Sequence, residues 1–298
     1  MNTAVDLFLS PFAYSFMQRG MVASVIVGVL CAVVGCYVVL RGMAFLGDAL
    51  AHAILPGVAV AYLFQSDLLL GALAAAILAA LLIGLFSRRE QVREDTAIGI
   101  VFAAALALGV ALMSTIKSYS IDLTHVLFGN VLGVGERDLW LIGGLGALVL
   151  TTIVLLYKEF LIASFDPVLG ATLRLPIGFL RNLMLIMLAL TVVISLQTVG
   201  VGLVAAMLVT PAATASLLTR RLPSMMIVAA AIGALSALSG LYLSFYVNVA
   251  SGAAVVLITT LFFMAAYLFA PGKGLAWQLT QKKRDSKRVA ASEEETAG

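Results

Sequence analysis

Long apolar stretches separated by short clusters of charge dominate this chain. Four uncharged intervals, 20–40, 68–87, 96–116 and 139–157, are each about one bilayer crossing long, since roughly 20 apolar residues in a helix span the hydrocarbon core. Each interval therefore predicts a single transmembrane helix.

Two longer uncharged intervals, 182–219 and 222–272, each leave room for two helices. Glycine permits a turn, so we expect Gly200 to divide the first interval, and the polar residues near Asn248 to divide the second. A further apolar stretch, roughly 43–64, adds one crossing. The pattern predicts an all-α integral membrane protein, a polytopic helical bundle of about 8–9 transmembrane helices.

Composition excludes a water-soluble globule. Hydrophobic residues make up 62% of the chain and charged residues 11%, which leaves too little polar surface for a soluble domain. The positive-inside rule assigns the cytoplasmic side from the clusters of lysine and arginine. These clusters lie in 88–93, at Lys158, Arg174 and Arg181, at 220–221 and in 282–288.

This orientation divides the chain into a transmembrane domain, 1–272, and a cytoplasmic tail, 273–298. The tail is polar and highly charged, so it cannot bury enough apolar surface to fold, and we expect it to be disordered. The segment 117–137 falls on the outer side. Its apolar residues predict a short surface helix over about 119–133.

A second segment that does not span the membrane, about 164–175, falls on the cytoplasmic side. Asp166 and Pro167 are typical of a helix start, with an acidic N-cap followed by proline in the first turn. Phe165 and Leu169 contribute to an apolar face at helical spacing. Either lipid or a partner protein must cover such a face.

Asp48 and His52 are the strongest candidates for chemistry. They are four residues apart inside an apolar stretch, so a helix places both on one face. Ionisable residues inside a span are costly and usually face a partner, a cavity or an ion path. Carboxylate and imidazole suit borderline divalent ions such as zinc, manganese and ferrous iron. Pro56 should break the helix just beyond them.

A structural explanation of this pair stays open. Asp48 and His52 could pair with each other or with a neighbouring helix near hydrated headgroups. Two ligands also make an incomplete site, because these ions usually take about four. A second copy of the pair across a symmetric interface would supply the rest.

Asp122 and His125 repeat the same chemistry at three-residue spacing in the outer segment. Exposed polar residues are ordinary in such a segment. These two residues are therefore a candidate outer metal contact without an argument from burial.

The chain contains no nucleotide-hydrolysing machinery that we can recognise. No G-x-x-x-x-G-K-[ST] loop occurs, and the nearest approach, at 271–274, lacks the first glycine and the hydroxyl. The two histidines, His52 and His125, have no hydrolase context. We therefore expect a transporter subunit rather than an enzyme, with any ATP hydrolysis on another chain.

One stretch resembles a known family closely. Residues 39–53 read VLRGMAFLGDALAHA, which is similar to the segment entering the second span of the permease subunits of zinc/manganese/iron ABC importers. Further similar pieces lie at 127–130, 164–167, 199–203 and 208–215. The resemblance covers about residues 14–270, and it departs at Asn130, where the family pattern suggests an acidic residue.

The resemblance implies a fold similar to the cobalamin and siderophore permeases, in a bacterial plasma membrane. It implies a second permease subunit, identical or paralogous, two cytoplasmic ATP-binding subunits and an extracytoplasmic metal-binding protein, with no nucleic acid. Asp48 and His52 would be the metal ligands, and the segment around Phe165, Asp166 and Pro167 would be the coupling helix that docks on the ATPase. The metal would be cargo, with no cofactor bound permanently.

A second class of function fits the same residues. In a proton-coupled secondary metal transporter, Asp48 would titrate as a proton relay. We recognise no internal repeats, which argues against that class. The ligand types accept manganese, zinc and iron, so the sequence does not settle the metal, although the small number of histidines and the Asp/His pair favour manganese over zinc.

Overall fold

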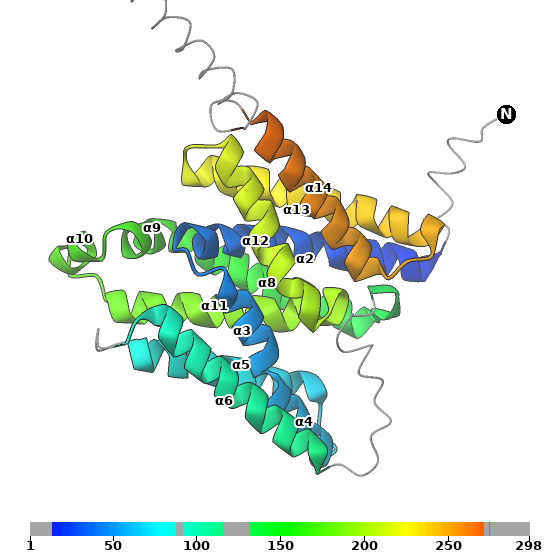
Figure 1. Ribbon diagram of the computed structural model, residues 1–298, viewed down its shortest axis with the longest axis horizontal. Coiled ribbons are helices and arrows are strands. Elements are labelled where there is room, and N and C mark those ends of the chain that lie inside the picture. Colours follow the sequence, from blue (N-terminus) through cyan, green and yellow to red (C-terminus); the bar gives the residue numbers. More distant parts are fainter. Residues whose placement is uncertain (1–13, 88–91, 116–130, 271–273, 275–298) are drawn as a thin grey trace, which may run out of the picture.

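The computed structural model describes residues 14–87, 92–115, 131–270 and Gly274, and these residues form helices joined by short turns (Figure 1). The elements are α2 (Ser15–Leu40), α3 (Phe45–Ala53), α4 (Leu55–Leu63), α5 (Leu68–Phe86), α6 (Glu94–Ser114), η3 (Val131–Gly133), α8 (Glu136–Leu155), α9 (Tyr157–Phe165), α10 (Pro167–Thr172), α11 (Ile177–Val199), α12 (Val201–Leu218), α13 (Leu222–Val247) and α14 (Ser251–Phe269). No strand occurs in these ranges.

Eight helices among the described residues are long and apolar enough to cross a membrane. One of the eight is the broken pair α3–α4, taken together as Phe45–Leu63. In α12 the stretch Val204–Leu218 is apolar but shorter, and it accounts for the uncertainty between eight and nine crossings. The predicted bundle of about 8–9 membrane helices is confirmed.

The helices break where the sequence predicted. Gly200 separates α11 from α12 with φ of 83°, a backbone conformation that favours glycine. Asn248 ends α13 in the left-handed region with φ of 56°, which asparagine tolerates better than most residues. The α3–α4 break lies just before Pro56, as expected for a residue that cannot continue the backbone hydrogen bonds.

Helix α2 lies at the centre of the bundle and contacts α8, α11, α12 and α13 (Figure 1). At the crossing of α2 and α13, a Cβ added to Gly28 would lie 2.7 Å from the Gly233 carbonyl oxygen. Small residues allow this backbone contact, which is the usual way membrane helices pack closely. Between α2 and α11, Cys31 Sγ and Ser195 Oγ lie 3.0 Å apart in the interior.

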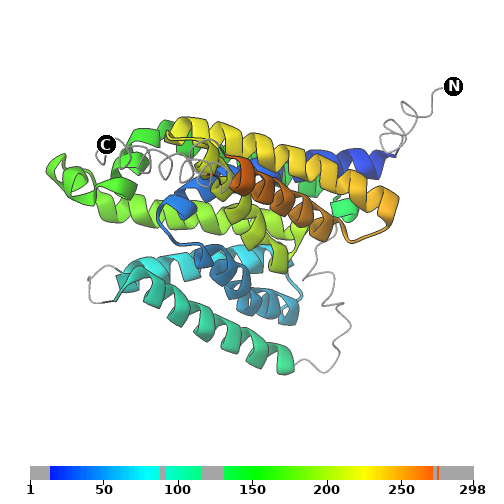
Figure 2. The ribbon, with the colours of Figure 1, turned by 45° about the horizontal axis from the view of Figure 1, so that its top comes forward.

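Helices α4, α5 and α6 form the side of the molecule opposite α13 and α14 (Figures 1 and 2). Gly57 of α4 and Gly71 of α5 face each other so closely that a Cβ on either would collide with the carbonyl oxygen of the other. Arg181 connects α11 to the end of α5. Its guanidinium donates to the carbonyls of Ser87 and Gly84, at 3.2 and 3.1 Å, and so caps the end of α5.

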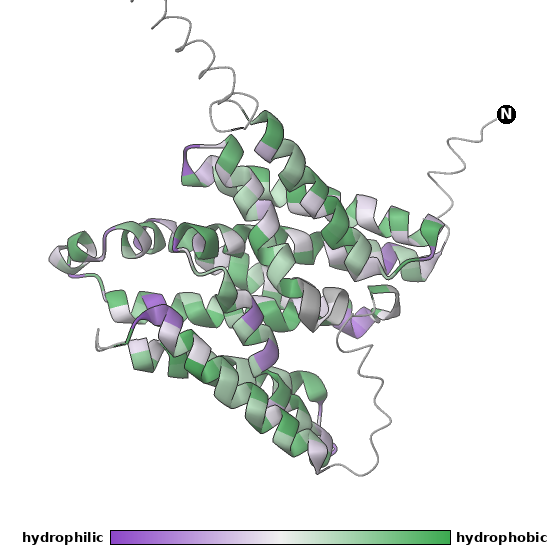
Figure 3. Ribbon diagram, viewed as in Figure 1, coloured by the Kyte–Doolittle hydropathy of each residue, from purple (hydrophilic) through white to green (hydrophobic). Residues whose placement is uncertain are grey.

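Polar residues gather mainly at the ends of helices, and α3 carries them in the middle of the bundle (Figure 3). Two sequence predictions lie largely outside the described residues. Of the outer helix expected over about 119–133, the structure describes η3, Val131–Gly133. Of the tail 273–298, it describes Gly274.

Candidate functional site

The short helix α3 presents Asp48 and His52 on one face. His52 Nε2 and Asp48 Oδ1 are 3.6 Å apart, and the two side chains are 26% and 43% exposed. The (i, i+4) spacing predicted this proximity. The remaining exposure leaves both groups accessible to a ligand, while their separation is long for a hydrogen bond between them.

The opposite face of α3 is packed into the bundle. Leu46 and Leu50 are fully buried. A Cβ added to Gly47 would lie 2.9 Å from Cδ1 of Leu208 on α12. Close packing therefore fixes the rotation of α3 about its axis, which in turn fixes the direction of the Asp48–His52 face.

Phe102 of α6 restrains the imidazole. The His52 and Phe102 rings lie edge to face, with their centroids 5.7 Å apart. Contacts of this kind are worth about 0.5–1.5 kcal/mol for aromatic pairs. This contact could not be predicted from the sequence, because Phe102 is one apolar residue in an apolar helix.

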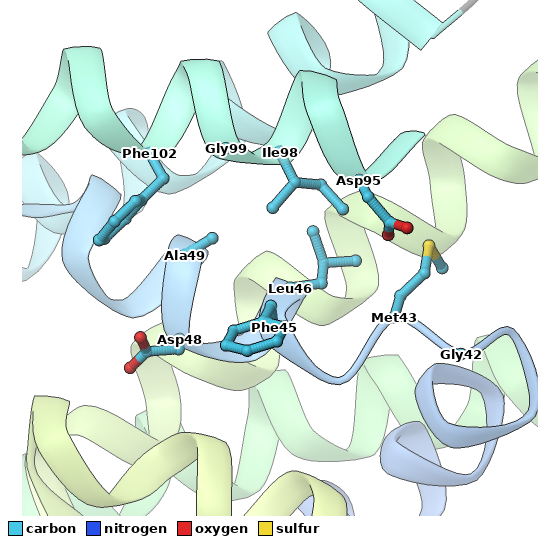
Figure 4. Close-up of a pocket in the computed structure, with 10 residues that line it drawn as sticks. All are labelled: Gly42, Met43, Phe45, Leu46, Asp48, Ala49, Asp95, Ile98, Gly99 and Phe102. Atoms are coloured by element: carbon cyan, nitrogen blue, oxygen red, sulfur yellow. The ribbon is translucent and has the colours of Figure 1, made fainter. Parts of the chain in front are cut away.

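A cavity of about 530 Å³ lies between α3 and α6 and includes Asp48 in its lining. Figure 4 shows its walls, which are largely apolar. A second carboxylate, Asp95 in the first turn of α6, lines the same cavity. In the sequence, Asp95 marks only the start of a predicted span. Its position directly after a basic segment is the one sequence feature that sets it apart.

The described part of the chain contains no group of three or more histidine, cysteine, aspartate or glutamate side chains suited to a metal. Asp48 and His52 thus form a pair, and borderline divalent ions usually need about four ligands. Water or a second chain must complete such a site. The outer candidates, Asp122 and His125, lie outside the described residues.

The segment expected at about 164–175 contains a helix start at the predicted position. Asp166 Oδ1 accepts a hydrogen bond of 2.8 Å from the Leu169 amide, and Pro167 is the first residue of α10. Asp166 also separates α10 from α9, so the segment is two short helices rather than one.

Apolar side chains are exposed at the junction of α9 and α10. Phe165 is 57% exposed, Val168 75% and Leu169 46%. Phe165 also lines a smaller cavity with Arg220 and Arg221, at the turn between α12 and α13. Exposed apolar side chains next to cationic ones suit contact with another protein or with lipid headgroups.

Comparison with known proteins identifies a family and several relatives. A model of the ABC 3 transport family matches residues 13–270. A manganese transport system membrane protein of Halalkalibacterium halodurans is 43% identical, over 98% of this chain and 100% of that protein. A chelated iron transport system membrane protein of Yersinia pestis is 39% identical, over 90% of each.

A solved structure shares the fold. PsaBC from Streptococcus pneumoniae, in complex with Fab, superposes with a TM-score of 0.80 and 38% identity, over 90% of this chain and 97% of that one. The match with the family model covers nearly the whole membrane domain. The chain therefore belongs to the ABC 3 transport family and is a membrane-spanning permease subunit of an ABC transporter.

Proposed function

We propose that this chain is the permease subunit of an ATP-driven importer of a divalent transition metal, and that Asp48 and His52 bind the ion during its passage. The observation that carries the proposal is the partly exposed Asp48–His52 pair, whose Asp48 lines a cavity, in a permease of this family. A proton-coupled carrier is disfavoured because ABC transporters draw their energy from ATP.

Two permease subunits would complete the metal site. One chain offers a carboxylate oxygen and an imidazole nitrogen. Two identical chains related by a twofold axis would offer two of each, as isologous contacts require. Water can fill the remaining positions around a six-coordinate ion.

Manganese is the cargo that we favour. Oxygen and imidazole ligands accept manganese, zinc and iron, so the ligand types do not choose among them. The relatives named above transport manganese or chelated iron by name, and that favours manganese over zinc.

The other subunits of the transporter would dock on two opposite faces of this chain. We assign α9 and α10 to the cytoplasmic side from the basic residues around them. Their exposed residues Phe165 and Leu169 would dock on an ATP-binding subunit, with Asp166 and Pro167 setting the turn. An extracytoplasmic binding protein would deliver the metal to the opposite face, in a bacterial plasma membrane with the tail inside.

The test is uptake of radioactive manganese by cells that depend on this transporter. Asp48→Asn and His52→Ala should each abolish uptake while the protein stays inserted at normal levels. His125→Ala removes the only other histidine of the chain and should lower uptake far less than His52→Ala. Equal losses at the two histidines would place the ion path elsewhere, and loss of the mutant protein from the membrane would indicate a structural role for the pair.

A further inference from the structure

The cavity beside Asp48 contains a second carboxylate that the proposed metal site does not use. Asp48 belongs to α3, and Asp95 belongs to the first turn of α6. Both line the same cavity of about 530 Å³. In Figure 4 they lie at opposite ends of it.

Apolar side chains separate the two carboxylates. Phe45, Leu46 and Ile98 lie between them in Figure 4. The Phe45 ring is 84% exposed at the start of α3. Among the described residues, Asp48 and Asp95 are the acidic residues that line the cavity, so an ion that moved along it from Asp48 would next meet the carboxylate of Asp95.

Asp95 differs from the acidic residue next to it. The Glu94 carboxylate interacts electrostatically with Arg41. Burial lowers the pKa of the Arg41 guanidinium, and the negative charge of Glu94 opposes that shift. Within the described residues, Asp95 has no ion pair or hydrogen bond of its side chain. A favourable interaction with the helix dipole accounts for an acid at either position, but it does not explain why one of the two faces the cavity.

The distribution of basic residues indicates which end of the cavity faces the cytoplasm. A basic segment, 88–93, immediately precedes α6, and the positive-inside rule assigns that end to the cytoplasm. Gly42 and Met43, in the turn before α3, line the cavity with Asp95. The cavity therefore extends from Asp48 toward the cytoplasmic end of the bundle.

We infer that this cavity is the inner part of the metal path, and that Asp95 receives the ion after Asp48 and His52 release it. The inference rests on the proposed function. A lone carboxylate attracts a divalent cation without holding it as a complete site would. Conduction requires that an ion bind favourably enough to enter the path and weakly enough to leave it. A single carboxylate near the cytoplasmic end of the path satisfies both requirements.

The experiment uses the complete transporter in proteoliposomes, with manganese as the probe. Equilibrium binding without ATP reports the Asp48–His52 site, and the initial rate of ATP-driven uptake reports passage. Asp95→Asn should leave binding unchanged and slow uptake by about tenfold, because it removes the charge at the exit. Asp95→Glu should recover most of the rate. Glu94→Gln removes the same charge from the same helical turn and should change the rate less than about twofold.

Two results would overturn the inference. If Asp95→Asn and Glu94→Gln slowed uptake equally, the charge of the helix start would be the cause. If Asp95→Asn abolished equilibrium binding, Asp95 would belong to the first site and not to a later step. Failure of the proposed function gives a different result, because Asp48→Asn would then keep normal manganese binding.

Discussion

At the scale of single residues, the imidazole of His52 depends on a neighbour that is not a ligand. The ring lies edge to face with Phe102, with centroids 5.7 Å apart. Ring contacts of this kind are worth about 0.5–1.5 kcal/mol, which corresponds to a change of up to about tenfold in an equilibrium constant. Phe102 therefore belongs to the site although it has no polar atom.

We expect Phe102→Leu to weaken manganese binding by up to about tenfold, because leucine keeps the wall apolar and removes the ring contact. Calorimetry on the purified transporter measures the change. Ile100→Leu is the control, since Ile100 lies on the same helix, is 53% exposed and does not line the cavity. Equal affinities for the Phe102 and Ile100 variants would show that the ring does not orient His52.

The sequence predicted that Asp48 and His52 lie together, but not what surrounds them. Asp48 and His52 stood out because ionisable side chains inside a span are costly, and their spacing already gave the shared face. Phe102 is one apolar residue among many, and Asp95 resembles any acid at a helix start. Their contribution depends on which helices are neighbours, and that is set by packing across the bundle.

At the scale of helices, the crossing of α2 and α13 depends on two glycines. A Cβ on Gly28 would lie 2.7 Å from the Gly233 carbonyl oxygen, so the larger side chain would force the backbones apart. We expect Gly28→Ala to lower the free energy of unfolding by about 1–3 kcal/mol. Thermal unfolding in detergent measures this.

Gly143 of α8 provides the matched control for that prediction. A Cβ added there meets nothing within 4 Å, and alanine favours helix by up to about 1 kcal/mol. Gly143→Ala should be neutral or slightly stabilising. A similar melting temperature for both variants would contradict the packing argument.

The coupling role of α9 and α10 can be tested separately from metal binding. Phe165→Asp or Leu169→Asp places a charge on the exposed apolar surface, which should release the ATP-binding subunit or uncouple ATP hydrolysis from uptake. Manganese binding should stay unchanged. Co-purification and ATPase assays measure the effect, and coupled transport by both variants at the normal rate would show that lipid covers this surface instead.

At the scale of the whole molecule, helix number and helix ends were predictable, whereas the arrangement in space was not. Bilayer length and uncharged intervals gave the spans, and Gly200 and Asn248 gave two of the breaks. The central place of α2 was not predictable, because its sequence is as apolar as its neighbours. The helix start at Asp166 and Pro167 was predictable from its N-cap signal, whereas the short helix α9 that ends just before it was not.

The number of metal ions bound per chain tests the symmetric site. The two candidate ligands of each chain, Asp48 and His52, are too few for a complete site, so two permease subunits should share one ion. We expect one manganese per two copies of this chain in the purified transporter, measured by mass spectrometry of the metal together with quantitative amino-acid analysis. One ion per copy would show that each chain binds its metal without the other.

The contact of Gly57 with Gly71 constrains how the transporter can change shape. The backbones of α4 and α5 are in direct contact at these two glycines. No flexible side chain of the described residues lies at this contact to adjust if one helix slid along the other. We therefore expect α4 and α5 to move together when the transporter changes shape, and the chain to bend at the break between α3 and α4 and at the turn after α5. Because Asp48 and His52 lie in α3 just before that break, a joint movement of α4 and α5 would change the position of these two residues relative to α5.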